Sequence, residues 1–320
     1  MNKPTDYVLV RDFRKSDLND VLDAIRLSFT EEFKVTGFDP DRARKMANQM
    51  FGIVGRIFLG FSKLLGKEPV KFLVAEVNRR VIGTTMVTMQ GKVGYISTVM
   101  VHPAYRRKGV AKKLTSYTLG YIEKREMKRA VLHVVSTNEP AKSLYSKLGF
   151  KNFEKIEYLL GKIDSLKHVK VEGVKTRSFK REDIDTVYDL IRSSEDPKHL
   201  EIFDFDKNKL KTPFSNKSFV FFTVNRIVAV QNDHVVGYVE ATCTTANEAG
   251  RIRNLQVYPE TRSKGIEEVL LYSAIEQIKR ARTKEVLVTV SSKRPELIAI
   301  MLQLGFEKRL EMDGMVLELV

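Results

Sequence analysis

The sequence lacks paired cysteines, a long uncharged apolar run and an apolar leader. Cys243 is the one cysteine among 320 residues, which excludes an intramolecular disulfide and a cysteine-rich zinc site. No apolar run of about 18 residues is without a charge, so we expect no transmembrane segment. Residues 1–10 contain no apolar core, so we expect no secretion signal and a cytoplasmic protein.

Basic residues are in excess, and they are concentrated in one half of the chain. Residues 1–160 hold 29 Lys and Arg against 16 Asp and Glu, a balance of +13, whereas residues 161–320 hold 26 against 24. The first half therefore predicts an anionic partner, either a phosphorylated cofactor, nucleic acid or an acidic protein. The alternative is a basic surface that keeps the protein in solution.

The chain contains an internal repeat. Three motifs recur at one offset of 156 residues: Val101-His102-Pro103 as Val257-Tyr258-Pro259, Arg106-x-x-Gly109 as Arg262-x-x-Gly265, and Leu148-Gly149-Phe150 as Leu304-Gly305-Phe306. Near the start of each copy, Arg11-x-Phe13 with Asp17 matches Arg177-x-Phe179 with Asp183 at an offset of 166, so the spacing differs there. Two copies of one unit are predicted, at residues 1–161 and 173–320, with a linker at 162–172.

Hydrophobic periodicity predicts the same order of elements in both copies, a mixed α+β sheet with helices on its faces. A strand and an amphipathic helix come first, then three strands, a helix after Gly109 or Gly265, a strand, a short helix and a last strand. The expected strands are residues 7–10, 72–77, 81–89, 95–101, 130–135 and 154–160 in the first copy, and 174–176, 219–224 with 227–230, 235–242, 251–257, 285–290 and 316–320 in the second.

A basic loop joins a strand to a helix after Pro103. The first N–H groups of a helix have no intrahelical partner, and the helix dipole adds partial positive charge there. Small residues let a phosphate approach those amides. This pattern indicates a pyrophosphate-binding loop, although a capped helix with a solvated basic start remains open. The candidate residues are Arg106, Arg107, Lys108, Gly109, Val110, Ala111 and Lys112.

A second motif runs from Asn138 to Phe150. Asn138 is at the expected N-cap of a helix, and Ala141 and Tyr145 are four residues apart, hence on one face of that helix. Tyr145 on its own is equally well explained as a core aromatic.

Together the two motifs resemble the GNAT (Gcn5-related) N-acetyltransferase superfamily. Its cofactor motif, Gln/Arg-x-x-Gly-x-Gly/Ala, is met by Arg106-x-x-Gly109-x-Ala111, and its Asn-x-x-Ala-x-x-x-Tyr-x-x-x-Gly-Phe motif is met from Asn138 to Phe150. The resemblance implies an α+β fold of two tandem GNAT units, each with a mixed, mostly antiparallel sheet whose parallel strands splay apart around acyl-CoA. It also implies that the cofactor's pantetheine arm contacts Val99, Met100, Val101, Asn138 and Ala141.

The activity implied by this resemblance is transfer of an acetyl or other acyl group from a CoA thioester to an amine, by direct attack, in the N-terminal copy. Tyr145 would lie near the sulfur and protonate the leaving thiolate, since a tyrosine with a pKa of about 10 stays protonated. No metal is expected. The proton acceptor stays open between ordered water, Glu76, His133 and His102.

The second copy departs from both motifs. Glu267 stands where the cofactor motif has a small residue, and it would place a carboxylate where a phosphate sits. Arg294 replaces Asn138, and Met301 replaces Tyr145. We therefore expect a folded copy that does not bind CoA in the usual way but buries an edge of the first copy, closes the acceptor cleft or forms a homodimer contact.

The sequence does not identify the acceptor, which could be a protein N-terminus, a lysine, a polyamine or another small amine. The first copy carries about twelve extra residues, and an apolar stretch in this region would form a pocket wall, pack on the second copy or lie on a membrane surface. Its apolar positions are Met46, Met50, Phe51, Ile53, Val54, Ile57, Phe58, Phe61, Leu64 and Leu65. The alternative function is a non-catalytic acyl-CoA-sensing or nucleic-acid-binding module; without a nucleic-acid motif, we do not expect nucleic acid as the partner.

Overall fold

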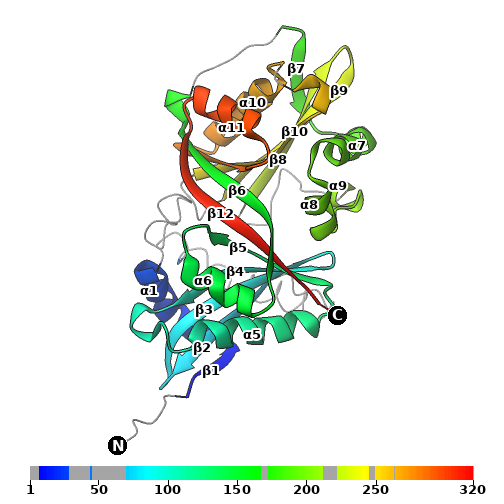
Figure 1. The fold of residues 1–320 in the computed structure, drawn as a ribbon. Helices are drawn as coiled ribbons and strands as arrows, with labels where there is room; N and C mark the ends of the chain where they lie inside the picture. The colour runs from blue at the N-terminus through cyan, green and yellow to red at the C-terminus, as the bar shows by residue number, and fades with distance from the viewer. Residues whose placement is uncertain are drawn as a thin grey trace, which may run out of the picture. The chain divides into compact units, whose positions relative to one another are not determined.

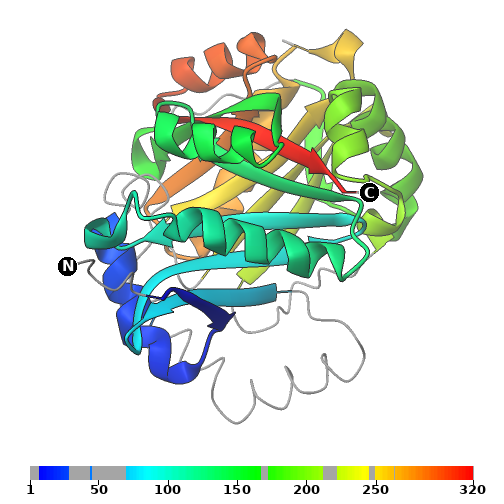
Figure 2. The same ribbon diagram turned by 60° about the horizontal axis from the view of Figure 1, so that its bottom comes forward.

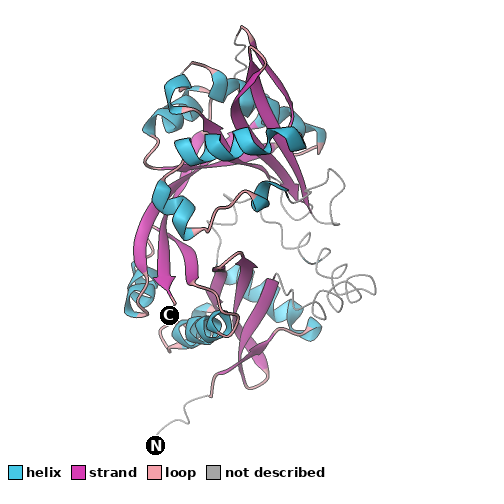
Figure 3. Cartoon of the chain, turned by 90° about the vertical axis from the view of Figure 1, so that its right-hand side faces the viewer, coloured by secondary structure: helices cyan, strands magenta, loops and turns pink. Residues whose placement is uncertain are grey.

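The computed structural model describes residues 7–28, 44, 70–166, 172–211, 222–244, 249–262 and 264–319, so the apolar stretch at 46–65 lies outside them. The chain forms two compact units (Figures 1 and 3). Unit 1 holds the described residues before Glu154 together with residues 313–319, and unit 2 holds Glu154–Met312. In the described parts of the chain, no helix has both the length and the apolar character needed to cross a membrane.

Unit 1 is an α+β sheet in the order β1-β2-β3-β4-β5-β12. Strands β1 to β4 pair antiparallel in sequence, and β4 and β5 are parallel. Helices α5 and α6 pack on one face of the sheet through a shared apolar cluster (Figure 2). The elements are β1 (Leu9–Asp12), α1 (Leu18–Ser28), β2 (Val70–Val77), β3 (Arg80–Gln90), β4 (Val93–Val101), α5 (Val110–Glu123), β5 (Arg129–Val135), α6 (Glu139–Lys147) and the end of β12 (Glu307–Glu318).

Unit 2 repeats this arrangement in the order β12-β6-β11-β10-β9-β8-β7, with β10 and β11 parallel. Strand β8 is continuous, whereas the sequence predicted two pieces at 219–224 and 227–230, because residues 222–231 all pair with β9. The elements are β6 (Lys151–Lys162), β7 (Val174–Ser178), α7 (Ile184–Ser194), α8 (Pro197–Ile202), α9 (Asn208–Lys211), β8 (Phe222–Gln231), β9 (His234–Thr244), β10 (Ala249–Val257), α10 (Ile266–Arg280), β11 (Glu285–Ser291) and α11 (Pro295–Gln303).

The last strands of the two sequence copies are exchanged. Strand β6, which ends the first copy, pairs antiparallel with β11 of the second copy from Ile156 to Lys162. The end of β12, which closes the second copy, joins β5 of the first: Leu319 N–H donates to Lys128 O at 2.8 Å. The compact units therefore divide the chain within β6 and β12 and differ from the predicted ranges 1–161 and 173–320, because each sheet takes its final strand from the other copy.

The repeated Arg-to-Asp motif is an ion pair that ties the first strand of each unit to the helical turn that follows. Arg11 binds Asp17 at 2.7 Å and also binds Glu76, and Arg177 binds Asp183 at 2.7 Å. The motif is therefore structural, and Glu76 is already engaged by a guanidinium.

Candidate functional site

Strands β4 and β5 of unit 1 separate partway along their length. They pair in parallel from Val93 with Arg129 to Ile96 with Leu132, and β4 then continues to Val101 without a partner on β5. The register between β4 and β3 shifts at this point, where Thr98 has φ 58°. A β-branched residue rarely adopts this backbone conformation, and such bulges redirect strands next to functional sites. The splayed gap expected from the sequence is therefore present.

The basic loop opens beside this gap. Gly109 is the N-cap of α5 with φ 79°, and the first intrahelical bond runs from the Lys113 N–H to Gly109 O at 3.0 Å. The N–H groups of Val110, Ala111 and Lys112 precede that bond, so the helix itself does not satisfy them. Four of the predicted residues are exposed on the loop and a fifth on the first turn of the helix: Arg106, Arg107, Lys108, Gly109 and Lys112. The loop can accept an anion at a helix N-terminus.

Helix α6 brings the second motif to the gap. Asn138 is the N-cap, as predicted, with its Oδ1 accepting from the Ala141 N–H at 3.2 Å. Ala141, Tyr145 and Val99 of β4 lie in one apolar cluster. Burial raises the pKa of Tyr145 to about 12, so its hydroxyl keeps its proton at any physiological pH. Val101 and Ala111 lie in a separate cluster at the start of α5.

A polar pair occupies the opposite face of the same strands. Ile96 and Leu132 pack in the Tyr145 cluster, and side chains alternate along a strand, so Tyr95 and His133 point to the other face. Tyr95 Oη lies 2.9 Å from His133 Nδ1, and the His133 ring packs edge-on against Phe153.

Two other candidate proton acceptors have structural partners. His102 Nδ1 accepts from the Ala104 N–H at 3.2 Å and caps a short helical turn. Glu76 belongs to the ion pair with Arg11. Of the three side chains named from the sequence, His133 alone lies on β5 where the two parallel strands separate.

Unit 2 has the same splayed strands with a different filling. Strands β10 and β11 pair only as far as Ile252 with Val288, and Asn254 takes the bulge conformation with φ 51°. The buried Arg294 donates from Nη1 to Leu255 O at 3.0 Å and to Gln256 Oε1 at 3.2 Å. A guanidinium of the protein therefore holds the strand edge that corresponds to Val99 and Met100.

Three other positions of the two motifs in unit 2, of which Arg262 is unchanged from unit 1, have side chains that contact the rest of the fold or are buried in it. Arg262, at the position of Arg106, donates to Ser194 O at 2.9 Å. Met301 is buried in the core. The Glu267 side chain is wholly buried, so it is not exposed at the loop opening as the sequence suggested.

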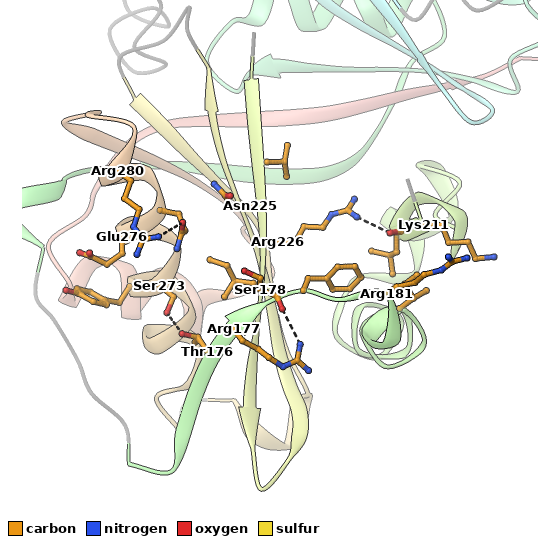
Figure 4. A pocket seen from close by; sticks show the side chains of 17 residues that line it. Thr176, Arg177, Ser178, Arg181, Lys211, Asn225, Arg226, Ser273, Glu276 and Arg280 are labelled. Atoms are coloured by element: carbon orange, nitrogen blue, oxygen red, sulfur yellow. Dashed lines mark hydrogen bonds between the residues drawn. The ribbon is translucent and has the colours of Figure 1, made fainter. Parts of the chain in front are cut away.

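A cavity of about 870 Å³ lies elsewhere in unit 2, between β7, β8 and α10 (Figure 4). Its lining includes Arg177 and Arg226, but the first binds Asp183 and the second donates to Leu210 O at 3.0 Å. The cavity contains none of the predicted site residues. Within the described residues, no three His, Cys, Asp or Glu side chains gather as a metal site.

Splayed parallel strands, a glycine-capped helix N-terminus and an asparagine-capped helix beside them define an acyltransferase class of fold. Residues 22–150 match the Acetyltransferase (GNAT) family. An acetyltransferase of Sodalis glossinidius is 33% identical over 104 residues, which cover 32% of this chain and 72% of that protein. The chain belongs to the GNAT acetyltransferase family, with two GNAT units in tandem.

Other relatives are matched over shorter shares of their length. N-alpha-acetyltransferase 30 of Schizosaccharomyces pombe is 32% identical over 77 residues, 24% of this chain and 51% of that protein. Mycothiol acetyltransferase of Streptomyces avermitilis is 33% identical over 89 residues, 27% of this chain and 29% of that protein. The chain thus spans about half of the first of these relatives and under a third of the second.

Solved structures confirm the tandem fold. A tandem GNAT protein from the clavulanic acid biosynthesis pathway aligns with a TM-score of 0.66 at 16% identity, over 98% of both chains. A GCN5-related N-acetyltransferase from Sphaerobacter thermophilus aligns with a TM-score of 0.63 at 17% identity, over 97% of this chain and 95% of that one.

Proposed function

We propose that the chain is an acetyl-CoA-dependent N-acetyltransferase whose active site lies in unit 1. The observation that carries the proposal is the gap after Ile96 in the β4–β5 pairing, with the exposed basic loop at one end and Tyr145 beside it. The family match supports acetyl transfer in general. The contrast with unit 2, where Arg294 donates a hydrogen bond to the equivalent strand edge, supports unit 1 as the site.

The loop residues would bind the diphosphate, and Val99, Met100, Val101, Asn138 and Ala141 would line the pantetheine path. The acceptor amine attacks the thioester carbonyl: the N–C bond forms and the C–S bond breaks. The electron pair of that bond goes to sulfur, and the thiolate takes the proton of Tyr145. A backbone N–H near Met100 would stabilise the carbonyl oxyanion.

The proton released by the amine goes to the other face of the strands, where His133 lies with Tyr95. His133 Nδ1 lies 2.9 Å from Tyr95 Oη, and a neutral imidazole can accept a proton. Proton donor and proton acceptor then stand on opposite faces of β5, so the amine and the leaving thiolate do not compete for one position. Both residues exchange protons with solvent to restore the starting state.

The acceptor class is a primary amine: a protein N-terminus, a lysine or a small amine. The alternative is a chain that senses acyl-CoA without turnover. Calorimetry with acetyl-CoA, followed by thiol release with a peptide N-terminus, Nα-acetyl-lysine and spermidine, separates these functions. Binding with turnover supports the enzyme, binding without turnover supports the sensor, and no heat at millimolar acetyl-CoA contradicts both.

A further inference from the structure

We propose that Asp313, near the end of the chain, is a positioning residue for acyl transfer in unit 1, because it fixes helix α6. The proposal rests on the proposed function, since α6 carries Asn138 and Tyr145. Asp313 comes from the second copy of the repeat. The second copy would therefore serve the first by completing its site.

The carboxylate of Asp313 is buried at the junction between β5 and α6. Its Oδ2 lies 3.0 Å from Lys142 Nζ, and its Oδ1 accepts from Ser136 Oγ at 3.0 Å. Lys142 Nζ also donates to Ser136 O at 3.0 Å. Burying a carboxylate costs free energy unless the carboxylate is paired and hydrogen-bonded. The contacts of Asp313 with Lys142 and Ser136 therefore fix the turn around Asn138.

The same strand supports the rest of the helix. Met315 is buried in the cluster that contains Tyr145, and Leu317 lies under Gly149, where an added Cβ would come within 3.1 Å of the Leu317 side chain. Hydrogen bonds to Asp313 and Glu139 raise the pKa of Lys142, which keeps the ammonium charged. Helix α6 is thus held by an ion pair at its first turns and by apolar contacts at its end.

Unit 2 contains only part of this arrangement. Comparison of the two units therefore shows which contact both folds share and which contact accompanies the candidate site. At the 156-residue offset, Ser292 corresponds to Ser136 and Glu157 to Asp313, and Ser292 Oγ lies 3.3 Å from Glu157 Oε1. The counterpart of Lys142 is Ile298, and Glu157 pairs with Lys308 at 2.7 Å instead. The serine-to-acid contact therefore belongs to the exchanged strands, whereas the lysine on the helix occurs only in the unit with Asn138 and Tyr145.

The test compares Asp313→Asn with Glu157→Gln, two buried acids in equivalent places. Misplacing reacting groups by about 1 Å costs up to about 100-fold in rate, so we expect Asp313→Asn to lower kcat about tenfold with the best amine of the panel. Amide hydrogen exchange of residues 139–147, measured without acetyl-CoA, should quicken. Glu157→Gln should leave both quantities within about twofold of wild type.

Lys142→Met removes the other partner of the same ion pair, and it replaces Asp313→Asn in the test if that variant does not fold. Lys142→Arg keeps the positive charge and should retain most of the kcat that Lys142→Met loses. Unchanged kcat and unchanged α6 exchange in Asp313→Asn and Lys142→Met would overturn the proposal, as would equal losses in Glu157→Gln. A wild-type chain without turnover contradicts the proposed function and the catalytic part of this inference together. Unchanged amide hydrogen exchange of α6 contradicts only the inference that Asp313 fixes this helix.

Discussion

Arg294 donates a hydrogen bond of 3.0 Å to Leu255 O, across the point where β10 and β11 part. The corresponding residues of unit 1 are Asn138 and Val99, and the Asn138 side chain instead caps its own helix through the Ala141 N–H. In unit 2 the Arg294 guanidinium thus donates to the strand edge, whereas in unit 1 the shorter Asn138 side chain hydrogen-bonds to the backbone of its own helix.

This difference predicts one acetyl-CoA per chain. Calorimetry should give a stoichiometry near one, and Asn138→Arg should lower the affinity at least about tenfold, because the guanidinium would occupy the strand edge in unit 1. Asn138→Asp is the matched control, since aspartate caps a helix as well as asparagine does. Two equivalents per chain, or full affinity in Asn138→Arg, would contradict the assignment.

Tyr145→Phe should lower kcat by about 100-fold and leave acetyl-CoA binding unchanged, since proton transfer by a placed side chain contributes about that much. The ring packs edge-on against Phe150 with centroids 6.0 Å apart, and phenylalanine keeps this contact. Because burial raises the Tyr145 pKa to about 12, the wild-type rate should not fall through loss of its proton below about pH 11. Full turnover in the variant would show that the Tyr145 hydroxyl has no part in the chemistry, whereas the packing of its ring in the fold would be unaffected.

Local patterns in the sequence predicted where two helices of the candidate site begin, because each motif encodes a local geometry. Gly109 marks a helix start and Asn138 marks an N-cap, and both occur as expected. The splayed strands followed from the resemblance to a family. These features involve residues close together in the chain, where spacing and residue type are sufficient evidence.

Long-range features were not predictable in the same way. Either β6 or β12 can complete either sheet, because both follow an equivalent helix, so the exchange leaves no mark in the repeat. Arg294 was identified as a substitution, but its reach to Leu255 depends on the side chain's path. Nothing in the sequence indicated that Asp313 forms an ion pair with Lys142, which is 171 positions away.

His133→Gln should lower kcat about tenfold or more, because the amide cannot take up a proton. Tyr95→Phe removes the 2.9 Å contact but leaves the imidazole, so its effect should be smaller. An unchanged kcat in His133→Gln would instead point to ordered water as the proton acceptor.

Substitutions at Gly109 and Gly120 of helix α5 distinguish the effect of backbone conformation from the effect of steric room. Gly109 and Gly120 both have open room for a Cβ, but only Gly109 has a positive φ, of 79°. Gly109→Ala should cost about 1 kcal/mol in stability and weaken acetyl-CoA binding, whereas Gly120→Ala should stabilise the chain by up to about 1 kcal/mol. Thermal unfolding and calorimetry measure both effects. Equal behaviour of the two variants would show that the left-handed conformation at Gly109 is not required.

The ion pair between Arg177 and Asp183 should make unit 2 sensitive to acid. Burial alone would raise the pKa of Asp183, but hydrogen bonds from Arg177 and from the Lys180 N–H lower it below its ordinary value of 3.8. A carboxylate with a depressed native pKa stabilises the fold above its unfolded value, near 4, and loses that contribution as the pH falls through the native value.

Arg177→Met should therefore destabilise the chain by about 1 kcal/mol at pH 7 and by less at pH 2, a modest figure because the guanidinium is partly exposed. Lys180→Met breaks the exposed pair with Glu182 and is the control, with an expected change under about 0.5 kcal/mol at either pH. Urea unfolding across this range gives both values. The same loss for Arg177→Met at pH 7 and pH 2 would mean that the arginine acts through packing and not through the Asp183 charge.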